Sequence, residues 1–187
     1  MLSHPPHRTG WTLRAAGAAD APALADLCAA HAAYERIPYS ADGHAHRLAQ
    51  GLEAGRLFAW LGYWGEQAVG YASATLDYST LAARSYLHLD CLYLEPAARG
   101  LGLGIELMAA VAVHARALGC AQLQWQTPVW NTDAIRFYDR LGATRLEKQR
   151  FTLPVGSGFL VDSYWDIANK LGWVLGAVVL NMTLAIN

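Results

Sequence analysis

The feature that most constrains the fold is an apolar strand that runs into a glycine-rich turn and then into a helix. The strand over 85–94 ends before Pro96, three glycines follow at alternate positions, and a helix is expected from Leu103 to Leu118, ended by Gly119. Glycine has no Cβ, so an anion can approach the backbone closely. The first N–H groups of the helix have no partner within it and point toward such an anion. The segment therefore predicts phosphate binding, with a glycine turn that binds no ligand as the alternative.

Two common phosphate-binding motifs do not fit this turn. A P-loop requires Lys-Ser or Lys-Thr after its last glycine, and neither dipeptide follows here. A dinucleotide fingerprint requires a third glycine where this chain has Ile105, and an acidic residue about twenty residues further on that is missing. The pattern that fits is Arg/Gln-x-x-Gly-x-Gly/Ala, filled by Arg99, Gly102 and Gly104.

A second motif lies downstream, between Trp125 and Leu146. A strand is expected over 121–127, and Asn131 or Thr132 can cap the short helix that follows. Gly142 ends that helix, and a further strand is expected to reach about residue 153. The helix carries the pattern Asn-x-x-Ala-x-x-Phe-Tyr-x-x-x-Gly-Ala.

Together the two motifs resemble the GNAT acetyltransferase superfamily. The resemblance implies an α/β fold: a central, mostly antiparallel sheet, splayed at the acetyl-coenzyme A (acetyl-CoA) site, with helices on both faces. It implies acetyl-CoA as co-substrate and no metal. Asn131 would contact coenzyme A, and Tyr138 would stand beside the thioester sulfur and protonate the departing thiolate. The alternatives are a plain helix cap for Asn131 and a core aromatic beside Ile135 for Tyr138.

The same resemblance assigns further residues to acetyl-CoA. Backbone N–H groups of the loop would hold the pyrophosphate, and the end of the preceding strand would pair with the pantetheine arm. The full set is Leu92, Tyr93, Leu94, Arg99, Gly100, Leu101, Gly102, Leu103, Gly104, Ile105, Asn131, Asp133, Ala134 and Tyr138.

Asp90 is a carboxylate in the middle of an apolar strand, where an unpartnered charge is costly. A neighbouring donor would satisfy it structurally. A substrate ammonium, or a water that takes a proton from the substrate, would satisfy it functionally. Relatives in the superfamily carry Glu or Asp at this place, nine residues before the loop arginine, as base or amine anchor. Asp is one methylene shorter than Glu, which favours relay through water. His88 shares the strand face with Asp90 and is a weaker candidate for that relay.

The resemblance is strongest to the diamine branch of the superfamily, the spermidine/spermine and thialysine acetyltransferases. In that branch a Tyr-Glu pair at the position of Tyr34 and Glu35 helps to hold the polar end of the substrate. One departure weakens the case for a polycationic substrate. The acidic residue that precedes Trp-Asn in the diamine enzymes is missing from the stretch 125–129.

Composition bounds the remaining possibilities. At 187 residues, 54% hydrophobic and 16% charged, the chain has material for one domain with a substantial core. A net charge of −1 without basic clusters counts against nucleic-acid binding. Three scattered cysteines give neither a disulfide framework nor a zinc motif, and a reducing cytoplasm is the simplest setting. His44 and His46 are expected on an exposed helix face rather than at a metal.

The expected organisation has three parts: a loose arm over 1–10, the acetyltransferase domain over 11–154, and an apolar extension over 155–187. The apolar run after Lys170 is short for a membrane span, so docking on the domain or a homodimer contact is expected there. Within the domain, the hydrophobic pattern predicts strands over 11–14, 56–64, 68–77 and 85–94. It also predicts a helix that Asp20 can cap and that reaches Tyr34, and a second helix over 44–52.

The function favoured by these features is acetyl transfer from acetyl-CoA to a primary amine of a small molecule, by direct attack in a ternary complex. The amine must first lose a proton, because amines with a pKa near 10.4 are almost wholly protonated at neutral pH. Asp90 would take that proton and Tyr138 would supply one to the thiolate. The rival interpretations are a non-catalytic acyl-CoA-binding module and an acetyltransferase for proteins or aminoacyl-tRNA.

Overall fold

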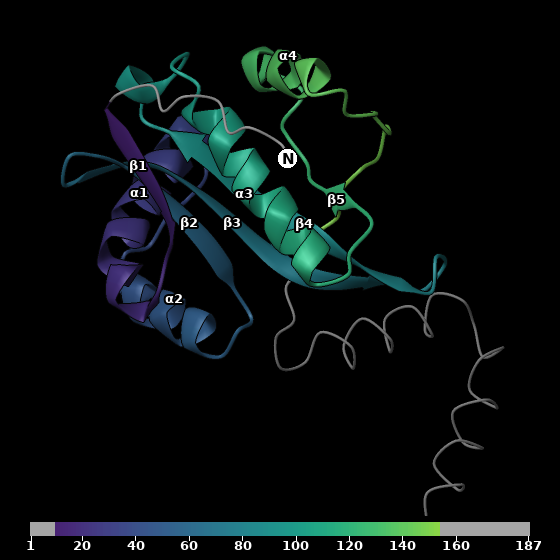
Figure 1. Cartoon of the computed structure of the whole chain (residues 1–187), viewed down its shortest axis with the longest axis horizontal. Helices are drawn as coiled ribbons and strands as arrows, with labels where there is room; N and C mark the ends of the chain where they lie inside the picture. Colours follow the sequence, from purple (N-terminus) through teal and green to yellow (C-terminus); the bar gives the residue numbers. More distant parts are fainter. Residues whose placement is uncertain (1–9, 154–187) are drawn as a thin grey trace, which may run out of the picture. The chain divides into compact units, whose positions relative to one another are not determined.

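The computed structural model describes residues 10–153, and it divides the chain into two compact units between Arg136 and Phe137. Figure 1 shows the elements in chain order. They are β1 (Trp11–Ala15), α1 (Ala21–Glu35), α2 (His44–Glu53), β2 (Phe58–Trp64), β3 (Gln67–Ser79), β4 (Arg84–Leu94), α3 (Leu103–Ala117), β5 (Leu123–Gln124) and α4 (Thr132–Arg140), with short 3-10 turns at Ala18–Asp20 and Pro96–Ala98.

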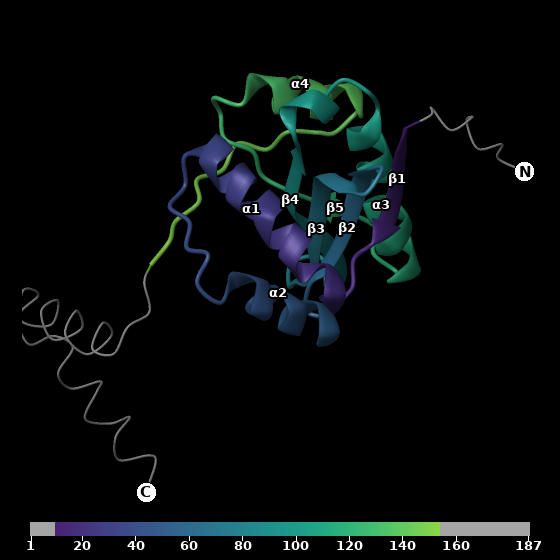
Figure 2. The same ribbon diagram turned by 90° about the vertical axis from the view of Figure 1, so that its left-hand side faces the viewer.

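The larger unit is built on a sheet with strand order β1-β2-β3-β4-β5. The first four strands pair antiparallel, and β4 pairs with β5 in parallel. In Figure 2, α1 and α2 lie on one face of the sheet and α3 lies on the other. This confirms the mixed α/β fold with helices on both faces that the sequence predicts.

Two packed layers hold this sheet. On the α1 face, Leu24 and Leu27 pack with Leu61, Tyr71 and other buried side chains of the central strands. On the other face α3 approaches so closely that a Cβ on Gly62 would come within 2.9 Å of Leu103. Burying side chains of this size stabilises the fold by roughly 1.5–3 kcal/mol each.

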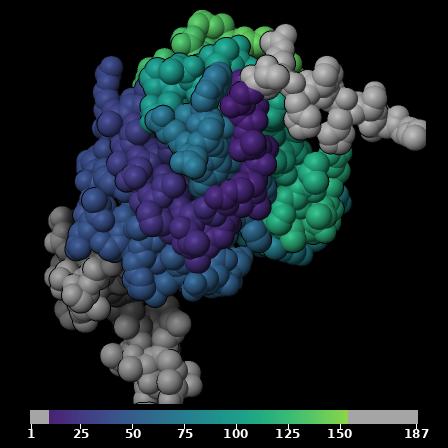
Figure 3. Space-filling view, turned by 60° about the vertical axis from the view of Figure 1, so that its left-hand side comes forward, coloured from purple at the N-terminus to yellow at the C-terminus, as the bar shows by residue number. Residues whose placement is uncertain are grey.

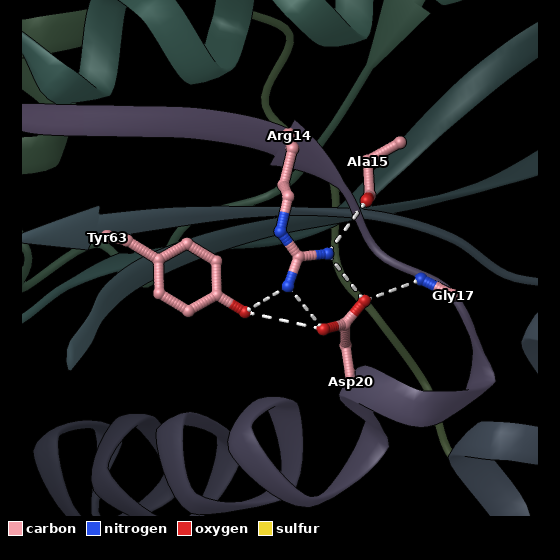
Figure 4. Close-up of polar contacts among 5 residues, drawn as sticks. All are labelled: Arg14, Ala15, Gly17, Asp20 and Tyr63. Carbon is pink, nitrogen blue, oxygen red and sulfur yellow. Dashed lines mark hydrogen bonds and ion pairs between the residues drawn. The ribbon is translucent and has the colours of Figure 1, made fainter. Parts of the chain in front are cut away.

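The edge of the sheet is formed by β1, which Figure 3 shows exposed along the surface beside α3. A polar cluster ties this strand to the start of α1 (Figure 4). Asp20 accepts hydrogen bonds from both terminal nitrogens of Arg14, at 2.7 and 2.6 Å, and from the N–H of Gly17 at 2.9 Å. The sequence predicts Asp20 as the side-chain cap of α1, but its carboxylate makes no cap hydrogen bond to that helix. The guanidinium of Arg14 instead lowers the pKa of Asp20 to about 2.

Two predicted strands are wrong in extent. The strand expected over 121–127 is reduced to Leu123–Gln124, and no strand forms over 143–153 within the described chain. The side chains of Leu146 and Phe151 are exposed there. A strand is stabilised by the partner it pairs with, so β-propensity without a neighbouring strand does not produce one.

The smaller unit contains the end of α4 and the turn that follows it. Gly142 has a φ of +79°, and its N–H donates to the carbonyl of Asp139, as expected for a glycine that ends a helix. The Asp139 carboxylate pairs with Arg145 beyond the turn. The predicted apolar extension over 155–187 lies outside the described residues.

Candidate active site

The glycine turn between β4 and α3 presents a row of backbone donors. Gly100 and Gly102 have φ values of +74° and +101°, which favour glycine, and a Cβ on Gly100 would meet no atom within 4 Å. Among the described residues, nothing accepts a hydrogen bond from the N–H groups of residues 100–104. The N–H of Ile105 bonds to the carbonyl of Gly102 at 3.0 Å and is therefore already engaged. Five donors at the start of a 15-residue helix suit an anionic ligand.

Arg99, predicted to bind the cofactor, is held against the protein in this structure. Its Nε donates to the carbonyl of Leu94 at 2.9 Å. Its guanidinium lies 4.6 Å from the ring centre of Tyr34 and 5.7 Å from that of Tyr93. Arg99 thus joins the glycine turn to the last turn of α1 through cation–π contacts.

Asn131, one of the two residues that the sequence allows as the cap of α4, caps that helix. Its Oδ1 accepts from the N–H of Ala134 at 3.2 Å and from the hydroxyl of Tyr34 at 3.4 Å. Asp133, in the first turn, is exposed and pairs with Arg136. Tyr34 therefore lies between the glycine turn and the start of α4, with its ring 5.8 Å from that of Trp130. Contact of Asn131, Asp133 or Ala134 with coenzyme A stays a prediction.

The strand β4 is interrupted at Asp90. Ser73 pairs with Cys91 and Ala74 with Leu89, so Asp90 is the extra residue of a β-bulge. The bulge leaves the Asp90 carboxylate exposed, which removes the burial cost that the apolar sequence suggests. Its Oδ2 lies 3.6 Å from the thiol of Cys91.

Beyond the bulge, the edge of β4 that faces away from β3 is open. Pairing with β5 covers Leu87 with Leu123 and His88 with Gln124, and stops there in the described chain. Residues 92–94 therefore follow a strand edge that β5 does not cover. This is the separation of central strands that the fold prediction requires.

A pocket of about 270 Å³ lies between α1, α2, β3 and β4. Glu35 and Asp90, both predicted to bind substrate, line it from α1 and β4. Tyr34, predicted with them, does not line it, because its ring is turned toward Arg99 and Asn131. The walls also include Tyr39, Tyr71 and other apolar side chains. Two carboxylates on apolar walls suit a small acceptor that carries positive charge.

His31 also lines this pocket, and sequence reasoning missed its role. Its Nδ1 lies 2.9 Å from the hydroxyl of Tyr71, and its Nε2 lies 3.4 Å from a carboxylate oxygen of Glu35. Its ring stacks on Tyr93 with centroids 5.0 Å apart. Burial lowers the pKa of His31, while Glu35 and Asp90 oppose that effect. The only sequence signal was the i,i+4 spacing of His31 and Glu35, which places them on one helix face.

The two thiols that line the pocket have raised pKa values. Burial, together with the charge of Asp90, raises the pKa of Cys91 to about 12. Burial also raises the pKa of Cys28. The thiolate is the nucleophilic form of cysteine, so neither side chain is an effective acyl acceptor.

Tyr138, the predicted general acid, lies on α4 in the smaller unit. Its ring meets Phe137 edge-on, with centroids 5.3 Å apart, and its carbonyl accepts from the N–H of Ala143 at 3.2 Å. Its role as proton donor stays a prediction.

Two further features bear on ligand classes. Within residues 10–153, no three His, Cys, Asp or Glu side chains converge as a metal site. In that same part of the chain, no helix combines the length and apolarity needed to cross a membrane.

Comparison with known proteins gives the family of the chain that carries this glycine turn, opened sheet edge and pocket. The model of the Acetyltransferase (GNAT) family matches residues 24–143, more than half of the chain. The chain belongs to that family, whose members use acetyl-CoA.

Individual relatives agree with this assignment. The chain is similar to the thialysine N-epsilon-acetyltransferase of Caenorhabditis elegans, at 31% identity over 137 residues, 72% of this chain and 84% of the relative. The Bos taurus thialysine N-epsilon-acetyltransferase is 37% identical over 82 residues, 44% of this chain and 48% of the relative. The structure of aminoglycoside N-acetyltransferase AAC(6')-Iy in complex with CoA is similar in fold, with a TM-score of 0.67 at 20% identity. That match covers 81% of this chain and 99% of the other.

Proposed function

We propose that this acetyltransferase moves an acetyl group from acetyl-CoA to a primary amine of a small, positively charged molecule. One observation carries the proposal: β4 connects the acceptor pocket, the open strand edge and the glycine turn. Asp90 lines the pocket, residues 92–94 follow the open edge, and the glycine turn comes after Pro96. A single strand therefore supplies part of the pocket wall and the open edge for acetyl-CoA, and it leads directly into the glycine turn.

The donor would bind along that strand. The N–H groups of residues 100–104 would hold the pyrophosphate at the positive end of α3. The edge over 92–94 would pair with the amides of the pantetheine arm, which would direct the thioester toward the bulge at Asp90.

The acceptor would bind in the pocket. Its walls carry the carboxylates of Glu35 and Asp90, which attract an ammonium group. The relatives whose names specify an acceptor include an L-ornithine N5-acetyltransferase of Arabidopsis thaliana, 30% identical over 80 residues, and the thialysine enzymes. Both named acceptors are amino acids with a second amine, which agrees with the charge of the pocket.

The reaction requires the acceptor nitrogen to lose two protons and the thiolate to gain one. The ammonium of the acceptor would give a proton to Asp90 through water, and its nitrogen would attack the thioester carbonyl carbon. The C–N bond forms, the C–S bond breaks, and the thiolate takes a proton from the Tyr138 hydroxyl. The new amide nitrogen gives up its second proton to solvent, from which Tyr138 is reprotonated. Burial raises the pKa of the Cys28 and Cys91 thiols, which counts against an acetylated cysteine intermediate and so favours direct transfer.

The test is product formation. The purified protein is incubated with acetyl-CoA and L-thialysine, L-ornithine or 2-phenylethylamine, and products are analysed by mass spectrometry with thiol release in parallel. We expect acetylation of the two amino acids at higher kcat/KM than of 2-phenylethylamine, which has no second charge. Thiol release that does not depend on any amine, with no acetylated product, would contradict the proposal.

A further inference from the structure

His31 is an ionisable group in the pocket that the proposed reaction does not use. It projects from α1 one turn before the end of that helix, its side chain is only 13% exposed, and both of its ring nitrogens have partners. A histidine held on both nitrogens by a hydroxyl and a carboxylate has a defined orientation and a defined tautomer. The shorter contact, at 2.9 Å, anchors the ring on Tyr71, and the 3.4 Å contact places Nε2 beside the carboxylate of Glu35.

The partners determine that tautomer. Glu35 accepts only, so the nitrogen that faces it, Nε2, carries the proton in the neutral ring. Nδ1 then accepts from the hydroxyl of Tyr71, a residue only 1% exposed. The chain of contacts runs from the core at Tyr71, through His31, to the pocket wall at Glu35.

The surroundings of His31 contain charges from several elements. Glu35 lies on its own helix, Asp90 comes from β4, and Arg99 follows β4. Across the pocket, α2 contributes His44. The two carboxylates favour a cation in the pocket. A protonated His31 would neutralise part of their charge and so compete with a bound cation.

We propose that His31 is a positioning residue for the acceptor: anchored by Tyr71, its neutral imidazole keeps the carboxylate of Glu35 directed into the pocket, where that carboxylate binds a positively charged group. This inference rests on the proposed function for the nature of the ligand. It adds a residue, and a pH dependence, that the reaction scheme lacks.

The pH dependence follows from charge. Neutral His31 leaves the negative charge of Glu35 available to the acceptor. Protonated His31 cancels that charge and repels a cation. Because burial lowers the pKa of His31 from its ordinary value, the neutral form prevails at pH 7, and acceptor affinity falls as the pH drops and His31 takes up a proton.

The test measures L-thialysine binding by calorimetry in the presence of coenzyme A, between pH 5.5 and 7.5, so that it does not depend on turnover. We expect His31→Gln to weaken binding about tenfold at pH 7 and to remove its pH dependence. Glu35→Gln should weaken binding similarly, and the double variant should be no worse than Glu35→Gln alone, because both changes disrupt one interaction. Coenzyme A affinity should be unchanged in all variants.

His46→Gln is the matched control, since His46 is exposed on α2 and does not line the pocket. Melting curves identify a variant that fails to fold, in which case His31→Asn replaces it.

In steady state, His31→Gln should raise KM for L-thialysine and leave kcat within about twofold. Unchanged binding in folded His31→Gln, or a pH dependence that persists in it, would overturn the proposal. If the wild type binds L-thialysine but acetylates no amine, the proposed function fails while the binding data still decide the role of His31.

Discussion

The part of the candidate site that would bind acetyl-CoA, the donor side, and the part that would bind the amine, the acceptor side, are built from different parts of the chain. The glycine turn offers backbone N–H groups from one short stretch, residues 100–104, and needs few side chains. The pocket is made by side chains from α1, α2, β3 and β4. A backbone site tolerates little change in conformation but much change in side chains, whereas a side-chain site can be retuned one residue at a time. The donor is therefore expected to be common to the family and the acceptor to vary.

The strongest test of this contrast is Gly102→Val. A Cβ there would meet Trp11 only at 3.7 Å, so space is available, but the φ of +101° strains any branched residue. The turn should change conformation, so that its backbone N–H groups no longer point toward one ligand. Calorimetric titration should therefore show that coenzyme A binding is lost. Gly17→Val is the control, because Gly17 has a φ of −105° and open space around it. Retained affinity in Gly102→Val would contradict the backbone assignment.

Tyr138→Phe should have the next largest effect. The change removes one hydroxyl, so coenzyme A affinity should barely change, while kcat should fall by about 10²-fold if that hydroxyl protonates the thiolate. Phe137→Leu, a change at the neighbouring aromatic, controls for packing of α4. Near-normal kcat in Tyr138→Phe, measured by thiol release, would return Tyr138 to a packing role.

Asp90→Asn should have a smaller effect that depends on pH. The variant keeps the shape of the bulge residue and loses its charge, so kcat should fall about tenfold near neutral pH, where the acceptor is almost wholly protonated. The loss should shrink toward pH 9–10, where free amine accumulates. Rate profiles of both proteins across this range provide the measurement. An equal loss at every pH would indicate a structural role for Asp90.

The sequence predicted the backbone features of single segments better than it predicted the contacts between distant segments. The glycine turn and the Asn131 cap were predictable because residues a few positions apart determine them. The bulge at Asp90 was not, because it arises from the register of β4 against β3. Nor was the turn of Tyr34 toward Asn131, 97 residues away in sequence. A short sequence pattern determines the geometry of its own segment, whereas contacts between distant segments depend on the packing of the whole fold.

The smallest expected effect lies outside both sides, in the cluster of Arg14 and Asp20 (Figure 4). Asp20→Asn removes an ion pair whose arginine is half exposed, so it should lower the free energy of unfolding by only about 1 kcal/mol at pH 7. The folded-state pKa of Asp20 is lowered to about 2. Its contribution is therefore complete above the unfolded pKa of about 3.9 and is lost as the pH falls through about 2. Urea unfolding at several pH values measures this. A difference between the proteins that persists unchanged at pH 2 would contradict the assigned pKa.

The central claim is that acetyl-CoA, along the open edge of β4 and the glycine turn, and the amine, in the pocket, are bound at the same time. Initial rates measured with acetyl-CoA and L-thialysine both varied test it most directly. Direct transfer in a ternary complex predicts double-reciprocal lines that intersect. Parallel lines, together with an acetylated protein isolated from acetyl-CoA alone, would show that the acetyl group passes through the enzyme and would contradict the account.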